Sequence, residues 1–214
     1  MKVLLINGSP HEEGSTYTAL RFIADEIEAG GIEAEIYHLA NEPVRSCIAC
    51  RKCKETKSNR CVFNDDDVNI IIDKMLTTDG LILGAPVYYG KPNGHLLSIM
   101  DRVFYAATGN EYFKNKPGAA ICVARRGGTT ASLDTMNKYF PINGMPMLPS
   151  CYWTMVHGRH PADVLKDYEG IQVMQLLGRN MVWMLKSIEA GKAAGIKVPE
   201  LPGGERIITN FIPD

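Results

Sequence analysis

The sequence lacks long apolar runs, an excess of either charge, and the patterns of several common catalytic sites. No apolar stretch approaches the roughly 18 residues that a membrane helix needs, although 45% of the 214 residues are hydrophobic. A formal net charge of −1 argues against the large basic surface that nucleic-acid binding usually requires. No Ser-His-Asp or paired-carboxylate arrangement stands out, so hydrolysis has no support. We therefore expect neither a membrane nor a nucleic acid as a partner.

The first ten residues, MKVLLINGSP, contain too short an apolar stretch for the core of a signal peptide. They are typical of a first β-strand, and we expect a cytoplasmic protein. In a reducing cytosol, closely spaced cysteines favour metal or redox chemistry over a disulfide framework. Four of the six cysteines are closely spaced in this way and are therefore candidates for chemistry.

Apolar runs of strand length alternate with helical patterns along the chain. We expect strands at 2–7, 33–39, 80–85, 118–124 and 145–153, and helices at 16–30, 65–78, 94–107, 129–140 and 169–191. Repeated strand-helix-strand units imply a parallel sheet with helices on both faces, because each crossover is right-handed. The predicted fold is a doubly wound, five-stranded α/β domain over 1–190. A tail at 191–214 is either a loose arm or a segment that packs on a neighbouring subunit.

The segment NGSPHEEGST (7–16) joins the first strand to the first helix and has the features of an anion site. Ser9, Ser15 and Thr16 supply hydroxyls near the positive end of the helix dipole, and small residues leave backbone N–H groups free to converge. No lysine follows Gly14, so the segment is not a P-loop, and the spacing of a dinucleotide fingerprint is missing. Such a cradle suits a monophosphate that is held without reacting. The alternative is a turn that binds nothing.

The segment GAPVYYGKPNG (84–94) follows the third strand, at the sheet edge where ligands bind in this kind of fold. Its prolines make it rigid, and Tyr88 and Tyr89 offer an aromatic face. These properties suit a flat isoalloxazine ring, which needs stacking area and donors aimed at its polar edge. Plain loop packing is the alternative.

The segment ARRGGTT (124–130) follows the fourth strand and would lie at the same edge. Its two glycines permit close approach of the backbone to a ligand. Arg125 or Arg126 would lie near the end of the ring that becomes negative on reduction. The alternative is an exposed basic turn before a helix capped by Thr129 or Thr130.

Four of the six cysteines lie in the run SCIACRKCKETKSNRC (46–61). Cys47, Cys50 and Cys53 are separated by two residues each, and Cys61 follows after seven more. This spacing lets thiolates converge on one small object, as in cluster-binding loops. Residues 40–64 would otherwise form an unusually long loop without structure. A 4Fe-4S cluster is the favoured interpretation, while zinc and free or disulfide-paired thiols stay open.

The motifs GSPHEEGST, APVYYG and MDR (100–102), with the Cys-rich insert after the second strand, resemble the flavodoxin-like NADPH-dependent FMN reductases. The iron-sulfur flavoproteins are the branch that the sequence resembles most. The resemblance covers residues 1 to about 190. It implies a strand order of 2-1-3-4-5, bound FMN, a 4Fe-4S cluster, and assembly into a homodimer or homotetramer.

The resemblance also assigns residues to the cofactors. The FMN-binding set that it implies is Ser9, Pro10, His11, Ser15, Thr16, Pro86, Val87, Tyr88, Tyr89, Gly90, Arg125, Arg126, Gly127 and Gly128. The implied cluster ligands are Cys47, Cys50, Cys53 and Cys61. His11 stands where relatives often have arginine, and ARRGGTT is shorter than the usual Gly-rich loop. No side chain is expected to be catalytic, because flavin N5 does the chemistry.

Three functions are compatible with these features. In the first, an enzyme of the FMN/quinone type takes hydride from NAD(P)H and passes electrons to a small-molecule acceptor. In the second, a ferredoxin-like protein docks on the basic residues between 51 and 60 and delivers electrons singly through the cluster to FMN. The third is a cluster-free FMN reductase with free thiols. In an oligomer, we expect the cysteine loop of one subunit to approach the flavin of another.

Several other residues have structural explanations. We expect the acidic run 65–67 to cap a helix, Asp101 and Arg102 to form an ion pair on a helix face, and Cys122 and Cys151 to fill the core. The segment WTMVHGRHP (153–161) is either a packed loop or a cover for the flavin.

Overall fold

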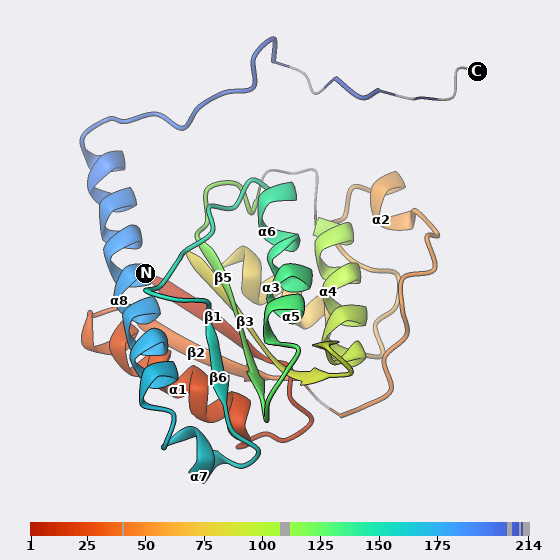
Figure 1. Ribbon diagram of the computed structural model, residues 1–214. Helices are drawn as coiled ribbons and strands as arrows, with labels where there is room; N and C mark the ends of the chain where they lie inside the picture. The colour runs from red at the N-terminus through yellow and green to blue at the C-terminus, as the bar shows by residue number, and fades with distance from the viewer. Residues whose placement is uncertain (40, 108–111, 205–206, 210, 212–214) are drawn as a thin grey trace.

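The computed structural model describes residues 1–39, 41–107, 112–204, 207–209 and 211, and its centre is one parallel sheet (Figure 1). The parallel strands are β1 (Lys2–Asn7), β2 (Glu33–His38), β3 (Gly80–Tyr88), β5 (Gly118–Ala124) and β6 (Met155–His157). Their order is β2-β1-β3-β5-β6, which confirms the predicted order 2-1-3-4-5 for these five strands. A short β4 (Lys91–Pro92), absent from the predicted set, pairs antiparallel with β3.

Helices cover both faces of the sheet (Figure 1). One face carries α1 (Ser15–Ala29), α7 (Pro161–Val164) and α8 (Tyr168–Ala193); the other carries α3 (Val68–Leu76), α4 (Gly94–Ala107), α5 (Thr129–Asn137) and α6 (Tyr139–Ile142). In β1, Val3 and Leu5 pack on the first face, while Leu4 and Ile6 pack on the second. Because both faces are buried, the strand consists of consecutive apolar residues rather than alternating ones.

The strand predicted at 145–153 is wrong in its placement. The last parallel strand begins at Met155, and the preceding segment meets the sheet at an isolated bridge between Gly118 and Met147. Pro146 and Pro149 lie in that segment and have no N–H to donate to a ladder. Regular pairing therefore starts only after the second proline.

A long connection, residues 41–67, links β2 to α3 and carries the four clustered cysteines. It contains one short helix, α2 (Lys52–Glu55). Figure 1 shows the connection running beside α4, and Ser46 Oγ lies 3.3 Å from Ser98 Oγ of that helix. Residue 40, the first of the predicted loop, lies outside the described residues.

The described part of the tail after α8 leaves the folded body. Beyond α8, the described residues follow an irregular path away from the sheet (Figure 1). None of the described helices combines the length and apolar character needed to cross a membrane.

Two loops touch at the carboxyl edge of the sheet. Tyr89 and Gly90, with φ of 51° and 73°, connect β3 to β4, and two left-handed residues in a two-residue hairpin loop are typical of a type I′ turn. Gly128 precedes α5 with φ of 94°, and a Cβ there would lie 2.7 Å from Gly90 Cα. Helix α5 therefore begins after a glycine rather than after the threonine cap of the alternative interpretation.

We expect Gly128→Ala to lower the free energy of unfolding by about 2 kcal/mol, because it adds a Cβ to a left-handed residue and forces it against another backbone. Gly127→Ala is the matched control, since a Cβ there meets nothing within 4 Å and should cost less than about 0.5 kcal/mol. Urea unfolding of both variants measures the difference. Equal stability of the two variants would contradict the contact between the loops.

Candidate functional site

A pocket of about 630 Å³ opens where β1, β3 and β5 end. Eight residues of the predicted FMN-binding set line it, namely Ser9, His11, Ser15, Thr16, Pro86, Val87, Tyr88 and Arg125. The other six, Pro10, Tyr89, Gly90, Arg126, Gly127 and Gly128, do not contribute to its described wall. The strand ends thus gather most of the predicted set around one cavity, and the binding of FMN by these residues stays a prediction.

The loop between β1 and α1 is fixed by hydrogen bonds that use its carbonyl groups. The Gly8 carbonyl accepts from Asn93 Nδ2 at 2.7 Å, and the Glu12 carbonyl accepts from Asn7 Nδ2 at 2.9 Å. His38 Nε2 lies 2.9 Å from the Ser9 carbonyl and therefore carries the proton, because a carbonyl only accepts. The N–H groups of Gly8, Ser9 and His11 are also bonded within the protein, so the loop is rigid, and free N–H groups are expected only at the start of α1.

Ser15, the first residue of α1, contributes an unused donor to this pocket. Its Oγ is buried and has no hydrogen-bond partner in the described structure. The first N–H groups of a helix also lack intrahelical partners, and the helix dipole attracts an anion to the same place. An unsatisfied buried hydroxyl is costly, so the donor set fits a bound phosphate group.

The two tyrosines of the third-strand loop do not act together. Tyr88 lines the pocket, with 45% of its surface exposed, whereas Tyr89 is fully exposed in the turn. The left-handed conformation of Tyr89 separates the two rings and is costly for an aromatic residue. A flat ligand would therefore meet Tyr88 and Val87, with Arg125 supplying positive charge.

The sequence did not assign one wall of the pocket. Gly158, Arg159, His160 and Pro161 line it; they lie in the segment 153–161, for which a packed loop and a cover for the flavin were both left open. Asp163 accepts hydrogen bonds from the N–H groups of His160 and Arg159, which hold the pKa of its carboxyl below the ordinary value. This capping box fixes the segment beside the pocket.

The other lining residues without a prediction are Glu13, Gly14, Val123 and Ala124. They flank predicted positions in the chain. They line the pocket because of the course of the chain just before α1 and at the carboxyl end of β5. Sequence patterns do not resolve such local directions.

The four clustered cysteines line a second, small cavity of about 20 Å³. Cys47 and Cys50 are exposed, while Cys53 and Cys61 are half-buried. Burial raises the pKa of the Cys53 thiol above its ordinary value. Within the described part of the chain, no three His, Cys, Asp or Glu side chains are grouped closely enough to hold a metal ion. The structure therefore gathers the four predicted ligands around one cavity without bringing their thiols to ligand distances.

Arg102 of α4 enters the same cavity, and its predicted partner is wrong. Its side chain is 1% exposed and forms an ion pair with Asp66. Asp101 instead accepts a hydrogen bond from the Tyr139 hydroxyl. Neighbouring residues on a helix point about 100° apart, so the side chains of Asp101 and Arg102 face different neighbours and do not pair with each other.

The acidic run 65–67 caps α3 through one residue only, because Asp66 Oδ1 accepts from the N–H of Val68, the first residue of the helix, at 3.3 Å. Asp65 pairs with Arg45, Asp66 pairs with Arg102, and Asp67 bonds the Tyr37 hydroxyl. Asp67 occupies the position before α3 but makes no side-chain cap bond to it. The run mainly fastens the cysteine loop and α3 to their neighbours.

The two remaining cysteines have different environments. Cys122 is buried in β5 as predicted, and burial raises the pKa of its thiol to about 12. Cys151 is exposed, so its prediction as a core residue is wrong, because it belongs to the proline-interrupted segment that stays outside the sheet.

Comparisons with known proteins agree with this arrangement. Residues 1–160 match the family model described as NADPH-dependent FMN reductase. An iron-sulfur flavoprotein of Methanocaldococcus jannaschii is 34% identical over 197 residues, which cover 88% of this chain and 100% of that protein. The iron-sulfur flavoprotein of Methanosarcina thermophila is 33% identical over 147 residues, or 68% of this chain and 75% of that one.

The fold has a flavodoxin among its solved neighbours. An archaeal flavodoxin superposes with a TM-score of 0.59 at 13% identity, covering 87% of this chain and 99% of that structure. At this identity the likeness concerns the fold alone. The sequence matches carry the family assignment, and the chain belongs to the NADPH-dependent FMN reductase family.

Proposed function

We propose that the protein is an FMN-dependent oxidoreductase that binds FMN in the 630 Å³ pocket. The unpartnered Ser15 Oγ at the start of α1 carries the proposal, because it needs an acceptor and lies where an anion is favoured. Ser9 and Thr16 line the same part of the pocket. These three residues and the first N–H groups of α1 would hold the phosphate.

The rest of the pocket suits the flavin ring. Pro86, Val87 and Tyr88 offer apolar and aromatic surface, and Arg125 lies on the wall beside them. When bound, FMN would supply the hydride and single-electron chemistry that side chains lack. The protein would orient the ring, cover part of it from water, and place positive charge beside it.

We expect Ser15→Ala to weaken FMN binding about ten- to a hundredfold, the effect of losing one hydrogen bond to a charged group. Because Ser15 Oγ is buried without a partner in the described structure, its removal should not lower the stability of the FMN-free protein and should raise it slightly. Fluorescence titration of the FMN-free protein with FMN measures the affinity, and denaturant unfolding measures the stability.

Thr18→Val is the matched control on the same helix. Thr18 Oγ1 already donates to the Gly14 carbonyl, so its removal should leave the affinity for FMN close to that of the unmodified protein. Unchanged FMN affinity in Ser15→Ala would count against a phosphate at the start of α1.

NAD(P)H is the electron donor of the proposed enzyme, a proposal that rests on the family's description. In anaerobic stopped-flow experiments, NADPH or NADH should bleach the flavin absorbance. The bleaching should be at least as fast as steady-state turnover of the enzyme with a small-molecule acceptor such as a quinone. If neither dinucleotide reduces the flavin, the NAD(P)H part of the proposal fails.

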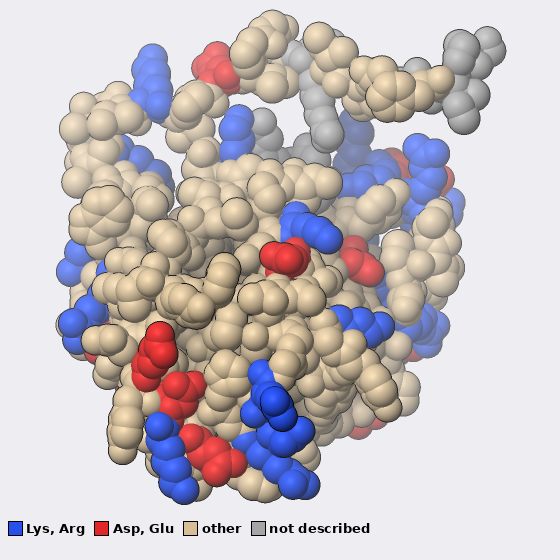
Figure 2. All heavy atoms as spheres, viewed as in Figure 1, with Lys and Arg blue, Asp and Glu red and all other residues tan. Residues whose placement is uncertain are grey.

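A second candidate is an electron carrier served by a ferredoxin-like protein. Exposed basic residues surround the cysteines, among them Arg51, Lys52 and Lys57, and Figure 2 shows Lys and Arg side chains gathered around α2. This surface is complementary to an acidic partner. Flavin reduction by reduced ferredoxin, but by neither dinucleotide in the same apparatus, would favour the carrier.

We further propose that Cys47, Cys50, Cys53 and Cys61 hold a 4Fe-4S cluster. They line one cavity, and the relatives named iron-sulfur flavoproteins support the same reading. Ala49, Arg51, Lys57 and Asn59 all have positive φ. Left-handed residues turn backbone N–H groups to one side, the geometry of concavities that bind anions and iron-sulfur clusters. A cluster would supply single-electron transfer between the protein surface and the flavin.

Anaerobic reconstitution should give about four iron and four sulfide per chain, as a cluster with four thiolate ligands requires. Cys61→Ser should lose most of this iron, whereas the exposed Cys151→Ser should keep it. Colorimetric iron and acid-labile sulfide assays are the measurements. Less than about one iron per reconstituted chain would exclude the cluster but leave the FMN proposal standing.

A further inference from the structure

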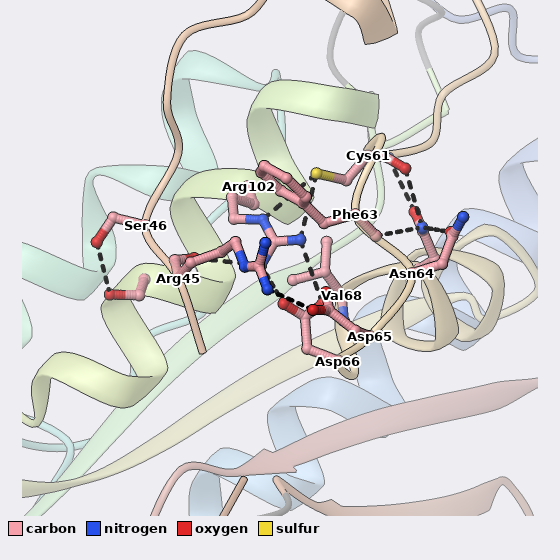
Figure 3. A network of polar contacts seen from close by, with 11 residues as sticks. Arg45, Ser46, Cys61, Phe63, Asn64, Asp65, Asp66, Val68 and Arg102 are labelled. Atoms are coloured by element: carbon pink, nitrogen blue, oxygen red, sulfur yellow. Dashed lines mark hydrogen bonds and ion pairs between the residues drawn. The ribbon is translucent and has the colours of Figure 1, made fainter. Parts of the chain in front are cut away.

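Cys61 is held from two helices, unlike the other cysteines of the run. From α3, the buried Asn69 accepts from the Cys61 N–H at 2.8 Å and donates to the Cys61 carbonyl at 3.0 Å. From α4, Arg102 reaches the Cys61 sulfur (Figure 3). Cys47 and Cys50 are exposed. The backbone and the sulfur of Cys61 are therefore both fixed before any metal binds.

The Arg102 guanidinium donates in three directions. Its Nε and Nη2 donate to Cys61 Sγ at 3.4 and 3.3 Å, and Nη1 and Nη2 donate to the Asp66 carboxylate. Nη1 also donates to the Arg45 carbonyl at 3.2 Å. Since Arg45 lies two residues before Cys47, Arg102 ties together the two ends of the cysteine run.

The surroundings make these contacts stronger than they would be in water. The Arg102 and Asp66 side chains are 1% and 5% exposed, and the Phe63 ring lies 5.3 Å from the guanidinium carbon. Charged groups interact more strongly when water is excluded. Asp66 balances the charge of Arg102, while the Cys61 sulfur and the Arg45 carbonyl receive its other hydrogen bonds.

We propose that Arg102 is a positioning residue for the cysteine site, which holds the Cys61 sulfur as a preformed ligand and raises the reduction potential of the cluster. This inference rests on the cluster of the proposed function. Hydrogen bonds donated to ligand sulfurs stabilise negative charge, which increases when a cluster gains an electron. Removing them should make reduction harder.

Arg102→Lys is the variant that tests this role. Lysine keeps a positive charge beside Asp66, whereas truncation would leave Asp66 charged and buried, which is strongly destabilising. An ammonium cannot reproduce the planar fork that serves the sulfur, the carboxylate and the Arg45 carbonyl together. We expect reduced iron content after reconstitution and a tenfold less favourable reduction equilibrium, which corresponds to a potential lower by about 59 mV for one electron.

Arg45→Lys is the matched control. Arg45 lies 4.5 Å over the same Phe63 ring and pairs with Asp65, but it makes none of the described bonds to Cys61 Sγ. It should keep the iron content and potential of the unmodified protein. The FMN content of both variants should also be unchanged, because neither arginine lines the flavin pocket.

The potential is measured by an anaerobic redox titration followed by electron paramagnetic resonance, with iron and sulfide counted per chain. A lower potential in Arg102→Lys alone supports the inference. A potential unchanged in Arg102→Lys, or lowered equally in Arg45→Lys, overturns it while the cluster stands. An unmodified protein that binds no iron and sulfide overturns the cluster itself, and the role of Arg102 with it.

If Arg102→Lys fails to fold, the double variant Arg102→Met/Asp66→Leu serves in its place. It removes both buried charges together, a replacement that is often neutral or stabilising, and it deletes both bonds to the sulfur. It should show the same loss of iron and the same lower potential. Iron content and potential equal to those of the unmodified protein would overturn the inference.

Discussion

A parallel sheet buried on both faces can present polar groups to a ligand only where its strands end. Here β1, β3 and β5 are apolar between their first and last residues and end at one edge, so the following loops converge there. The residues of the loop between β1 and α1, the Tyr88 segment and Arg125 are far apart in sequence and line one pocket for this reason. The alignment of the strand ends sets the position of the site, and the loops supply the groups that would contact a ligand.

The cysteine site depends on a different constraint, since it lies off the sheet beside α4. That helix connects the two sites: Asn93, just before its first residue, donates to the loop between β1 and α1, and Arg102 donates to Cys61. Nine residues separate them, or about 14 Å of helix. This helix thus fixes how far the Cys61 sulfur stands from the loop between β1 and α1, and so sets the relative placement of the two sites.

Most of the fold was predictable because apolar periodicity reports burial directly. The strands at 2–7 and 118–124 and the helix at 94–107 have the predicted bounds. The last strand was misplaced because apolar residues around Pro146 and Pro149 resemble a strand while lacking the donors for one. The site was predicted in part: Ser15 and Tyr88 line the pocket, but the contribution of residues 158–161 depends on where β6 ends. The partner of Arg102 lies 36 residues away, and no local pattern reports such a pair.

Local strain is concentrated at the two sites. Of the six non-glycine residues described with positive φ, four lie in the cysteine run and a fifth is Tyr89, next to Tyr88 of the pocket at the strand ends. Such conformations cost about 1–2 kcal/mol each for residues other than glycine and asparagine, which here are Ala49, Arg51, Lys57 and Tyr89. Ser15 adds a buried hydroxyl without a partner in the described structure. Packing alone would remove these costs by placing glycine or asparagine in the turns and alanine at position 15. The strained residues and the unpaired hydroxyl coincide with the two proposed cofactor sites. A chain that binds FMN and a cluster is expected to show this, because contacts with the bound group offset the free-energy cost of the unliganded conformation.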